Sequence, residues 1–239
     1  ILALVHAETS TGVCQPMEGV GDLCRKHNCL LLLDTVTSLG GVPLYIDEWK
    51  VDLAYSCSQK GLSCPPGLGP FTMGPRAEEK MTSRSGKVPN WYLDVSLLNR
   101  YWGSDRVYHH TAPVNMNFGM REALRLLAEE GLDEAWARHR RNAERLWSGL
   151  ERQGLSMHVP EERRLPTLTT VRIPDGVDGK AFSQHLLNTF GIEVGGGLGS
   201  LAGKIWRIGL MGYNSTPENV DRLLNLFETE LPRFSGSVA

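Results

Sequence analysis

The sequence has no long apolar run and no excess of charge of one sign. Its longest apolar runs, such as residues 30–33, are far shorter than the roughly 20 residues that a membrane-spanning helix needs. The 25 basic and 27 acidic residues leave a formal net charge of −2, and no basic block is present. We therefore expect neither a nucleic-acid partner nor a membrane partner.

Cysteine is scarce, and none of the five cysteines lies in Cys-x-x-Cys spacing. An odd number of cysteines in a chain of 239 residues argues against a disulfide framework and favours a reducing compartment. A zinc site is the alternative interpretation of the cysteines. No pair has finger-like spacing, however, and His6 and His27 do not complete a site, so we expect no metal ion.

The sequence also lacks an initial methionine and begins inside an apolar segment. Residues 1–5 are typical of a buried strand, and no charged segment or cleavage site precedes them, so they do not indicate a signal peptide. The chain is expected to be the C-terminal part of a longer protein.

Three short apolar segments, at residues 1–5, 29–33 and 51–55, indicate strands, and residues 19–28 between the first two have the pattern of a helix. Continuous apolar strands that alternate with helices are typical of a parallel sheet covered on both sides. The carboxyl ends of such strands lie at one edge of the sheet. We therefore expect the polar clusters that follow these strands to meet in space; they are residues 8–11, 34–38 and 56–60.

The rest of the chain predicts helices and a second, smaller sheet. Thr111 lies near a helix N-cap and Pro113 suits the first helical turn. From residue 154 the pattern is typical of helices packed on one face of a short antiparallel sheet. The predicted strands are residues 69–73, 155–159, 168–173, 192–195 and 204–210, and the predicted helices are residues 113–130, 132–153, 179–190 and 217–231.

Lys60 and Asp34 each follow a predicted buried strand. A lone lysine there is most often a solvated loop residue, but a desolvated lysine can act as a nucleophilic amine that forms Schiff bases. A lone aspartate there is either a turn residue or a buried anion that needs a cation. With both residues at strand ends, a cofactor that carries a pyridinium ring and a carbonyl group would fit between them. Its ring nitrogen would pair with Asp34, and its carbonyl carbon would meet Lys60. Pyridoxal phosphate (PLP) needs this pair of groups.

Six stretches of the sequence resemble the class V aminotransferases, in particular the alanine–glyoxylate (serine–pyruvate) aminotransferases. They are HAETSTG at 6–12, LDTVTSLGG at 33–41, YSCSQKG at 55–61, YHHTAP at 108–113, RLPT at 164–167 and GKIWRIG at 203–209. The resemblance implies an α/β fold, the fold-type I architecture of PLP-dependent transferases. Residues 1–130 would be the second half of the large, mostly parallel-sheet domain, residues 131–153 a linking helix, and residues 154–239 a small α+β domain. The N-terminal part, with its glycine-rich phosphate loop and ring-stacking aromatic residue, would be absent.

The resemblance assigns cofactor roles to four residues. Lys60 would form the Schiff base with PLP and then move the proton between the substrate carbon and the cofactor. Asp34 would pair with the pyridine nitrogen, and Gln59 would contact the cofactor phosphate. Thr9 would form a hydrogen bond near the ring oxygen or the substrate.

Three further residues would complete the site. Arg207 would bind the substrate carboxylate in the bidentate manner of a guanidinium. Without the resemblance, an arginine on a predicted strand is more often a surface residue. Tyr108 and Thr111 would reach the phosphate of the neighbouring subunit's cofactor, which implies a homodimer with shared active sites. His109 and His110 are expected to be structural.

The activity implied by the resemblance is the transfer of an amino group from L-alanine or L-serine to glyoxylate, giving pyruvate or hydroxypyruvate and glycine. The alternatives are a kynurenine-pathway transaminase and a non-catalytic fragment that only folds or dimerises. Cysteine desulfurase chemistry needs a cysteine in the small domain, whereas all five cysteines lie at or before Cys64. The family suggests a peroxisomal location, but the sequence ends without a Ser-Lys-Leu type address, and mitochondrial and cytoplasmic locations remain alternatives.

Overall fold

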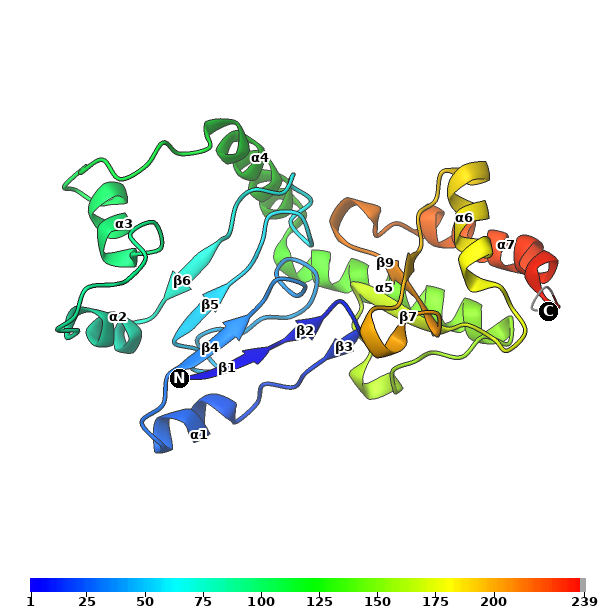
Figure 1. The fold of residues 1–239 in the computed structure, drawn as a ribbon, viewed down its shortest axis with the longest axis horizontal. Helices are drawn as coiled ribbons and strands as arrows, with labels where there is room; N and C mark the ends of the chain where they lie inside the picture. The colour runs from blue at the N-terminus through cyan, green and yellow to red at the C-terminus, as the bar shows by residue number, and fades with distance from the viewer. Residues whose placement is uncertain (237–239) are drawn as a thin grey trace.

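A four-stranded sheet forms the core of the first half of the chain. In the computed structural model, which describes residues 1–236, the spatial order of its strands is β1-β4-β5-β6. The strands are β1 (Leu2–Val5), β4 (Leu31–Asp34), β5 (Leu53–Tyr55) and β6 (Phe71–Met73). β1, β4 and β5 are parallel, as expected, and β6 is antiparallel to β5. Figure 1 shows this sheet on the side of the molecule that carries the N-terminus.

Helices and a short hairpin surround this sheet. The hairpin consists of β2 (Ala7–Glu8) and β3 (Val13–Cys14), and α1 (Val20–Lys26) connects it to β4. Leu31 and Leu33 of β4 are fully buried and pack in one cluster with Met17 and with Cys24 of α1. After β6 the chain forms three helices: α2 (Pro75–Thr82), α3 (Val95–Trp102) and α4 (Val114–Glu130).

The start of α4 differs from the expectation. Pro113 occupies the N-cap position rather than the first turn, and no side chain caps the helix. The Thr111 hydroxyl instead forms a hydrogen bond with the Tyr108 hydroxyl, at 2.8 Å. A proline at the N-cap has no side-chain acceptor to offer the free amides of the first turn.

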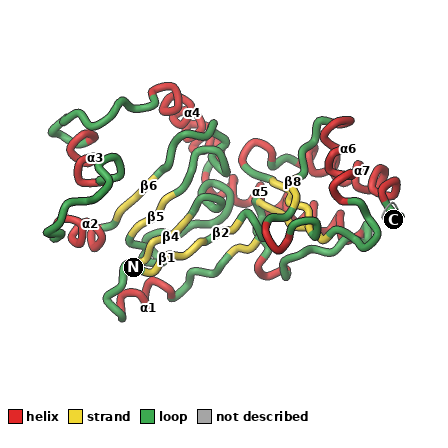
Figure 2. Tube along the Cα trace, viewed as in Figure 1, coloured by secondary structure: helices red, strands yellow, loops and turns green. Residues whose placement is uncertain are grey.

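The long helix α5 (Leu132–Arg152) leads from the first sheet to a second, antiparallel sheet (Figure 1). The second sheet has the order β7-β9-β8. Figure 2 shows its strands in yellow beside α5. Its elements are β7 (Leu168–Arg172), α6 (Gly179–Phe190), β8 (Gly195–Gly196), β9 (Ile205–Gly209) and α7 (Pro217–Glu230). Short 3-10 turns join them: η1 (Glu161–Arg163), η2 (Gly199–Leu201), η3 (Gly212–Asn214) and η4 (Leu231–Phe234).

An aromatic cluster forms the centre of this second layer. Phe182 of α6, Trp206 of β9 and Phe227 of α7 pack edge to face, with ring centroids 5.0–5.5 Å apart. Edge-to-face pairs add to the stabilisation that comes from burying the rings. Within residues 1–236, no helix is both long enough and apolar enough to cross a membrane.

Two predicted strands are wrong. Residues 155–159 pair with β7 only at one bridge, Met157 with Val171, flanked by hydrogen bonds from the His158 amide to the Thr170 carbonyl and from the Arg172 amide to the Ser156 carbonyl. Pro160 follows and has no amide to extend the ladder. In residues 192–195, the amide of Ile192 bonds back to the Leu186 carbonyl and closes the end of α6. Pairing with β9 therefore begins only at Gly195. Residues 237–239, the end of the expected small domain, lie outside the described residues.

The buried carboxylate of Asp52 ties β4 to the start of α2. It accepts a hydrogen bond from the Leu31 amide at 2.8 Å and pairs with Arg76 at 3.0 Å, and its residue is only 3% exposed. In a full-length protein that contains this chain, Asp52→Ala should lower the free energy of unfolding by about 3–5 kcal/mol, because it leaves a charge and an amide unpaired. Denaturant titration measures this loss. Asp221→Ala is the control, since its pair with Arg145 is half exposed and is worth about 1 kcal/mol or less. Equal losses in the two variants would contradict the prediction.

His6, at the end of β1, is buried and packs edge to face against Trp49. Burial lowers the pKa of His6 from 6.5 to about 4, and the charge of Glu18 offsets only part of this shift. The unfolded chain therefore binds a proton at this residue below pH 6.5, whereas the folded protein does not until about pH 4. Between these values stability should fall by about 1.4 kcal/mol for each pH unit of acidification. Unfolding measured at several pH values should show this extra slope in the wild type and not in His6→Asn; identical slopes would disprove it.

Candidate active site

Lys60 and Arg207, which are 147 positions apart in the sequence, line one cavity of about 700 Å³. Lys60 comes from the turn after β5, and Arg207 lies at the middle of β9. The cavity is therefore formed between the first sheet and the second. Its other lining residues are Gln59, Ser63, Cys64, Pro65, Leu168, Glu193, Gly195, Gly209, Met211, Tyr213 and Asn214.

Close backbone packing fixes the turn that carries Lys60. The Lys60 carbonyl accepts the Ser63 amide at 3.0 Å, and buried Ser58 donates its hydroxyl to the Pro65 carbonyl at 2.7 Å. A Cβ on Gly61 would lie 2.3 Å from the Leu39 carbonyl oxygen. Only glycine fits there, so the turn after β5 packs directly against the turn after β4.

Asp34 ends β4, and both of its carboxylate oxygens accept a hydrogen bond. One oxygen accepts the Val36 amide at 2.8 Å, and the other accepts the Tyr55 hydroxyl at 2.7 Å. The hydrogen bond to Asp34, together with burial and the charge of Asp34, raises the pKa of Tyr55 to about 12. Tyr55 therefore stays protonated at neutral pH and acts as the donor. Asp34 is not among the residues that line the cavity.

Tyr55 was not identified from the sequence. Asp34 and Tyr55 are register partners in the parallel β4–β5 ladder. The sequence signal for this hydrogen bond is a tyrosine at the end of one apolar strand and an aspartate at the end of the neighbouring strand. The pairing of the two residues becomes evident only once the strand register is known.

The expected meeting of the three polar clusters is confirmed for two of them. The Thr35 amide donates to the Tyr55 carbonyl at 2.9 Å, and the Ser56 hydroxyl donates to the Thr35 carbonyl at 3.0 Å. The first cluster instead contacts the second sheet, since Thr170 donates its hydroxyl to the Thr11 carbonyl at 2.8 Å.

Arg207 is held between this first cluster and the glycine-rich segment that includes β8. Its Nε donates to the Gly196 carbonyl at 2.7 Å, and its Nη1 donates to the Thr9 carbonyl at 3.3 Å. The structure therefore brings Thr9 close to Arg207. Both bonds are to backbone oxygens, so the positive charge of the guanidinium has no carboxylate partner among the hydrogen bonds of the described residues.

Tyr108 and Thr111 do not join Lys60 in the cavity of this chain. They bond to each other, Tyr108 is 70% exposed, and neither residue lines the cavity. Neighbouring His109 is buried and stacks on Trp91 with ring centroids 4.0 Å apart, in keeping with a structural role. His110 pairs with the His109 ring at 2.8 Å.

The residues present fit a bound PLP. The cavity volume is within the range of about 300–1,000 Å³ that is typical of small-molecule sites. It offers an amine at Lys60, an amide side chain at Gln59 and a guanidinium at Arg207. A carboxylate oriented by two donors lies at the end of the adjacent strand.

Comparison with known proteins agrees with this arrangement. The family model described as aminotransferase class-V matches residues 1–223. The alanine–glyoxylate aminotransferase of Oryctolagus cuniculus is 47% identical over 241 residues, covering 99% of this chain and 62% of that protein. A solved alanine–glyoxylate aminotransferase from Nostoc sp. is 66% identical with a TM-score of 0.92, covering 95% of this chain and 60% of that one.

A solved ureidoglycine–glyoxylate aminotransferase from Bacillus subtilis has a TM-score of 0.94 and 40% identity, covering 97% of this chain and 60% of that one. This chain thus spans about 60% of the length of these relatives. The fold is the fold-type I architecture, and the chain belongs to the class V aminotransferase family.

Proposed function

We propose that this chain is part of a PLP-dependent transaminase that moves an amino group from L-alanine, or L-serine, to glyoxylate. The observation that carries the proposal is that Lys60 and Arg207 line the same cavity. An amine and a carboxylate-binding guanidinium in one cavity are what amino transfer between an amino acid and a keto acid requires. The products would be pyruvate, or hydroxypyruvate, and glycine.

Class V aminotransferases depend on PLP. In this chain Lys60, Asp34, Gln59 and Thr9 would hold the cofactor. When bound, PLP supplies an electron sink for the negative charge that develops on the substrate carbon. The other residues that the cofactor needs would come from parts of the full-length protein outside this chain.

The chain's own residues would bind the substrate and move a proton. Arg207 would bind the carboxylate of both the donor and the acceptor, because both half-reactions use one cavity. The Lys60 amine would take and return the proton at the substrate α-carbon. The Tyr55 hydroxyl would keep the Asp34 carboxylate in a fixed orientation through its 2.7 Å hydrogen bond.

A symmetric homodimer is the proposed assembly. Tyr108 and Thr111 do not line their own chain's cavity and would reach the cofactor phosphate of a second subunit. They adjoin exposed aromatic side chains: Trp91, Tyr92 and Trp102 are each between 55% and 61% exposed. Aromatic residues are enriched at the cores of protein interfaces, and a symmetric interface uses the same surface twice.

The alternatives are less well supported. The three relatives described above are all named for glyoxylate, which favours glyoxylate as the acceptor over a kynurenine-pathway reaction. Purified protein that stays colourless with added PLP would favour the non-catalytic fragment. The division at residues 130 and 154, the amino donor and a peroxisomal location remain predictions.

Lys60 should carry the cofactor in a full-length protein that contains this chain. Borohydride reduction of the PLP-loaded protein followed by peptide mapping should place the pyridoxyl label on Lys60. Lys60→Ala should abolish turnover of alanine with glyoxylate, whereas Lys26→Ala, on α1 and outside the cavity, should not. A label on another lysine would falsify the assignment.

Arg207→Lys should impair both substrates alike. Loss of a bidentate charged hydrogen bond costs about 1.5–3 kcal/mol, which corresponds to a fall in kcat/KM on the order of 10- to 100-fold. Steady-state kinetics with alanine and with glyoxylate measure the effect. Arg172→Lys, in the neighbouring strand β7 but outside the cavity, is the matched control. Values within about twofold of the wild type for Arg207→Lys would mean that the carboxylate binds elsewhere.

A further inference from the structure

The turn after β9 forms one wall of the cavity that contains Lys60. Met211, Tyr213 and Asn214 line the cavity, and Gly212 at the start of η3 lies between them in sequence. The turn directly continues the strand that carries Arg207. Its position therefore determines how that strand meets the Lys60 turn.

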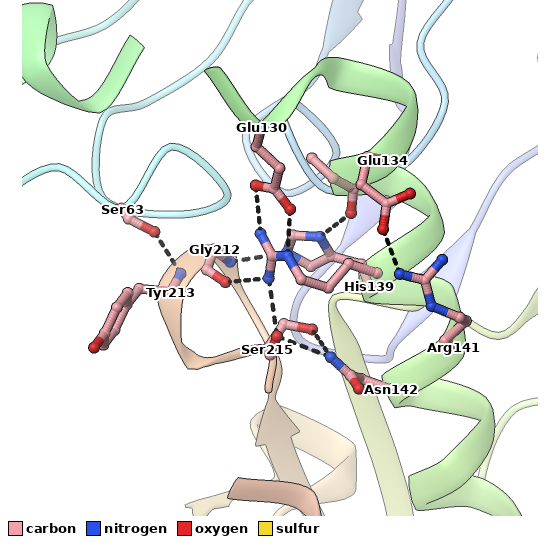
Figure 3. Close-up of polar contacts among 11 residues, drawn as sticks. Ser63, Glu130, Glu134, His139, Arg141, Asn142, Gly212, Tyr213 and Ser215 are labelled. Carbon is pink, nitrogen blue, oxygen red and sulfur yellow. Dashed lines mark hydrogen bonds and ion pairs between the residues drawn. The ribbon is translucent and has the colours of Figure 1, made fainter. Parts of the chain in front are cut away.

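His139 of α5 holds this turn from the side of the helix (Figure 3). Its ring is fully buried, with Nδ1 2.6 Å from the Ala135 carbonyl and Nε2 2.9 Å from the Gly212 amide. A carbonyl only accepts and an amide N–H only donates, so Nδ1 carries the proton and Nε2 is the acceptor. Burial lowers the pKa of His139, which favours this neutral form.

Ser63 holds the same turn from the side of the first sheet. Its hydroxyl oxygen accepts the Tyr213 amide at 2.8 Å, and Figure 3 shows Ser63 and His139 on either side of the turn. Gly212 has a φ of +56°, and a Cβ on it would lie 1.7 Å from the Ser63 oxygen. Consecutive amides of the turn are therefore bound by two different parts of the fold.

Ser63 and His139, on either side of the η3 turn, each also contact another turn of the site. Ser63 lies three residues after Lys60 and donates its amide to the Lys60 carbonyl. His139 packs beside Gly41, in the turn after β4, where an added Cβ would lie 3.6 Å from the ring. A Cβ on Gly41 would also lie 2.2 Å from the Thr167 methyl group, so the turn after β4 packs closely against the residue that precedes β7.

We infer that His139 is a positioning residue that, by binding the Gly212 amide, sets the separation between Lys60 and Arg207. The inference rests on the proposed function of these two residues. Without the His139 acceptor, the η3 turn would lose the hydrogen bond to its first amide and keep only those that Arg138 and Asn142 donate to its carbonyls on this side, so β9 would shift relative to the Lys60 turn. Arg207 would still bind a carboxylate, but the bound substrate would be misplaced for proton transfer by Lys60.

The expected signature is a loss in kcat with little change in KM. A misplacement of about 1 Å in an active site can lower the rate by roughly 100-fold. In the PLP-loaded full-length protein, His139→Asn should reduce kcat per loaded site by about 10- to 100-fold and change KM by less than about threefold. His139→Gln, whose side-chain amide oxygen can reach the position of Nε2, should recover most of the rate.

Amide hydrogen exchange gives a readout that does not depend on activity. A peptide covering residues 211–215 should exchange faster in His139→Asn than in the wild type, and His139→Gln should restore most of the protection. His185→Asn is the matched control, because it removes a histidine hydrogen bond to Glu230 on the outer layer of the second sheet. It should change neither kcat per loaded site nor exchange at 211–215. Ser63→Ala, which removes the acceptor of the Tyr213 amide, should also accelerate exchange, and it serves as the second variant if His139→Asn does not fold.

The possible results separate this inference from the proposed function. Wild-type activity per loaded site in His139→Asn would overturn the positioning role while leaving the transaminase intact. A wild-type protein that does not transaminate would overturn the proposed function. The crystal structure of His139→Asn would then decide the inference: a changed Lys60–Arg207 separation supports it, and an unchanged one refutes it.

Discussion

The turns after β4, β5 and β9 meet so closely that Gly61 and Gly212 have no room for a side chain, and the site depends on this constraint. A Cβ on Gly61 would lie 2.3 Å from the Leu39 oxygen, and one on Gly212 would lie 1.7 Å from the Ser63 oxygen. These contacts bring three backbone segments together that carry Asp34, Lys60 and Arg207. Since protein interiors are close-packed and resist small displacements, such a junction fixes the relative positions of the three residues.

Much of the fold could be predicted from local sequence signals. Helix α6 has the predicted bounds because Asp178 caps its first turn and Gly191 ends it in the left-handed conformation that glycine favours. The parallel strands were predictable from their apolar runs. Residues 155–159 and 192–195 have similar apolar patterns but do not form the predicted strands. Pairing of the first segment with β7 stops at Pro160, and the Ile192 amide of the second segment bonds back to the Leu186 carbonyl of α6. An apolar run does not reveal where its pairing begins or stops.

Some residues of the candidate site could likewise be predicted from local sequence signals, and others could not. Lys60 and Asp34 could be predicted because each follows a buried strand, and their turns do meet. Tyr55, Ser63 and His139 could not, because their roles come from register and from contacts over many residues, such as the 73 positions between His139 and Gly212. A lone histidine on the buried face of a helix gives no sequence signal that distinguishes a packed side chain from one that binds a distant amide.

Helix α5 binds the turn after β9 with both kinds of hydrogen-bonding group. Arg138 donates to the Gly212 and Ser215 carbonyls, each at 2.9 Å, while His139 accepts the Gly212 amide. Asn142, four residues after Arg138 and so on the same side of the helix, also donates to the Ser215 carbonyl, at 2.8 Å. An apolar side chain in place of His139 would fill the space but leave a buried amide unpaired, at a cost of about 1–3 kcal/mol. A protonated histidine would present only donors to that amide. A neutral histidine, with one donor and one acceptor on a rigid ring, satisfies both the helix carbonyl and the turn amide, and this combination couples the linking helix to the wall of the cavity.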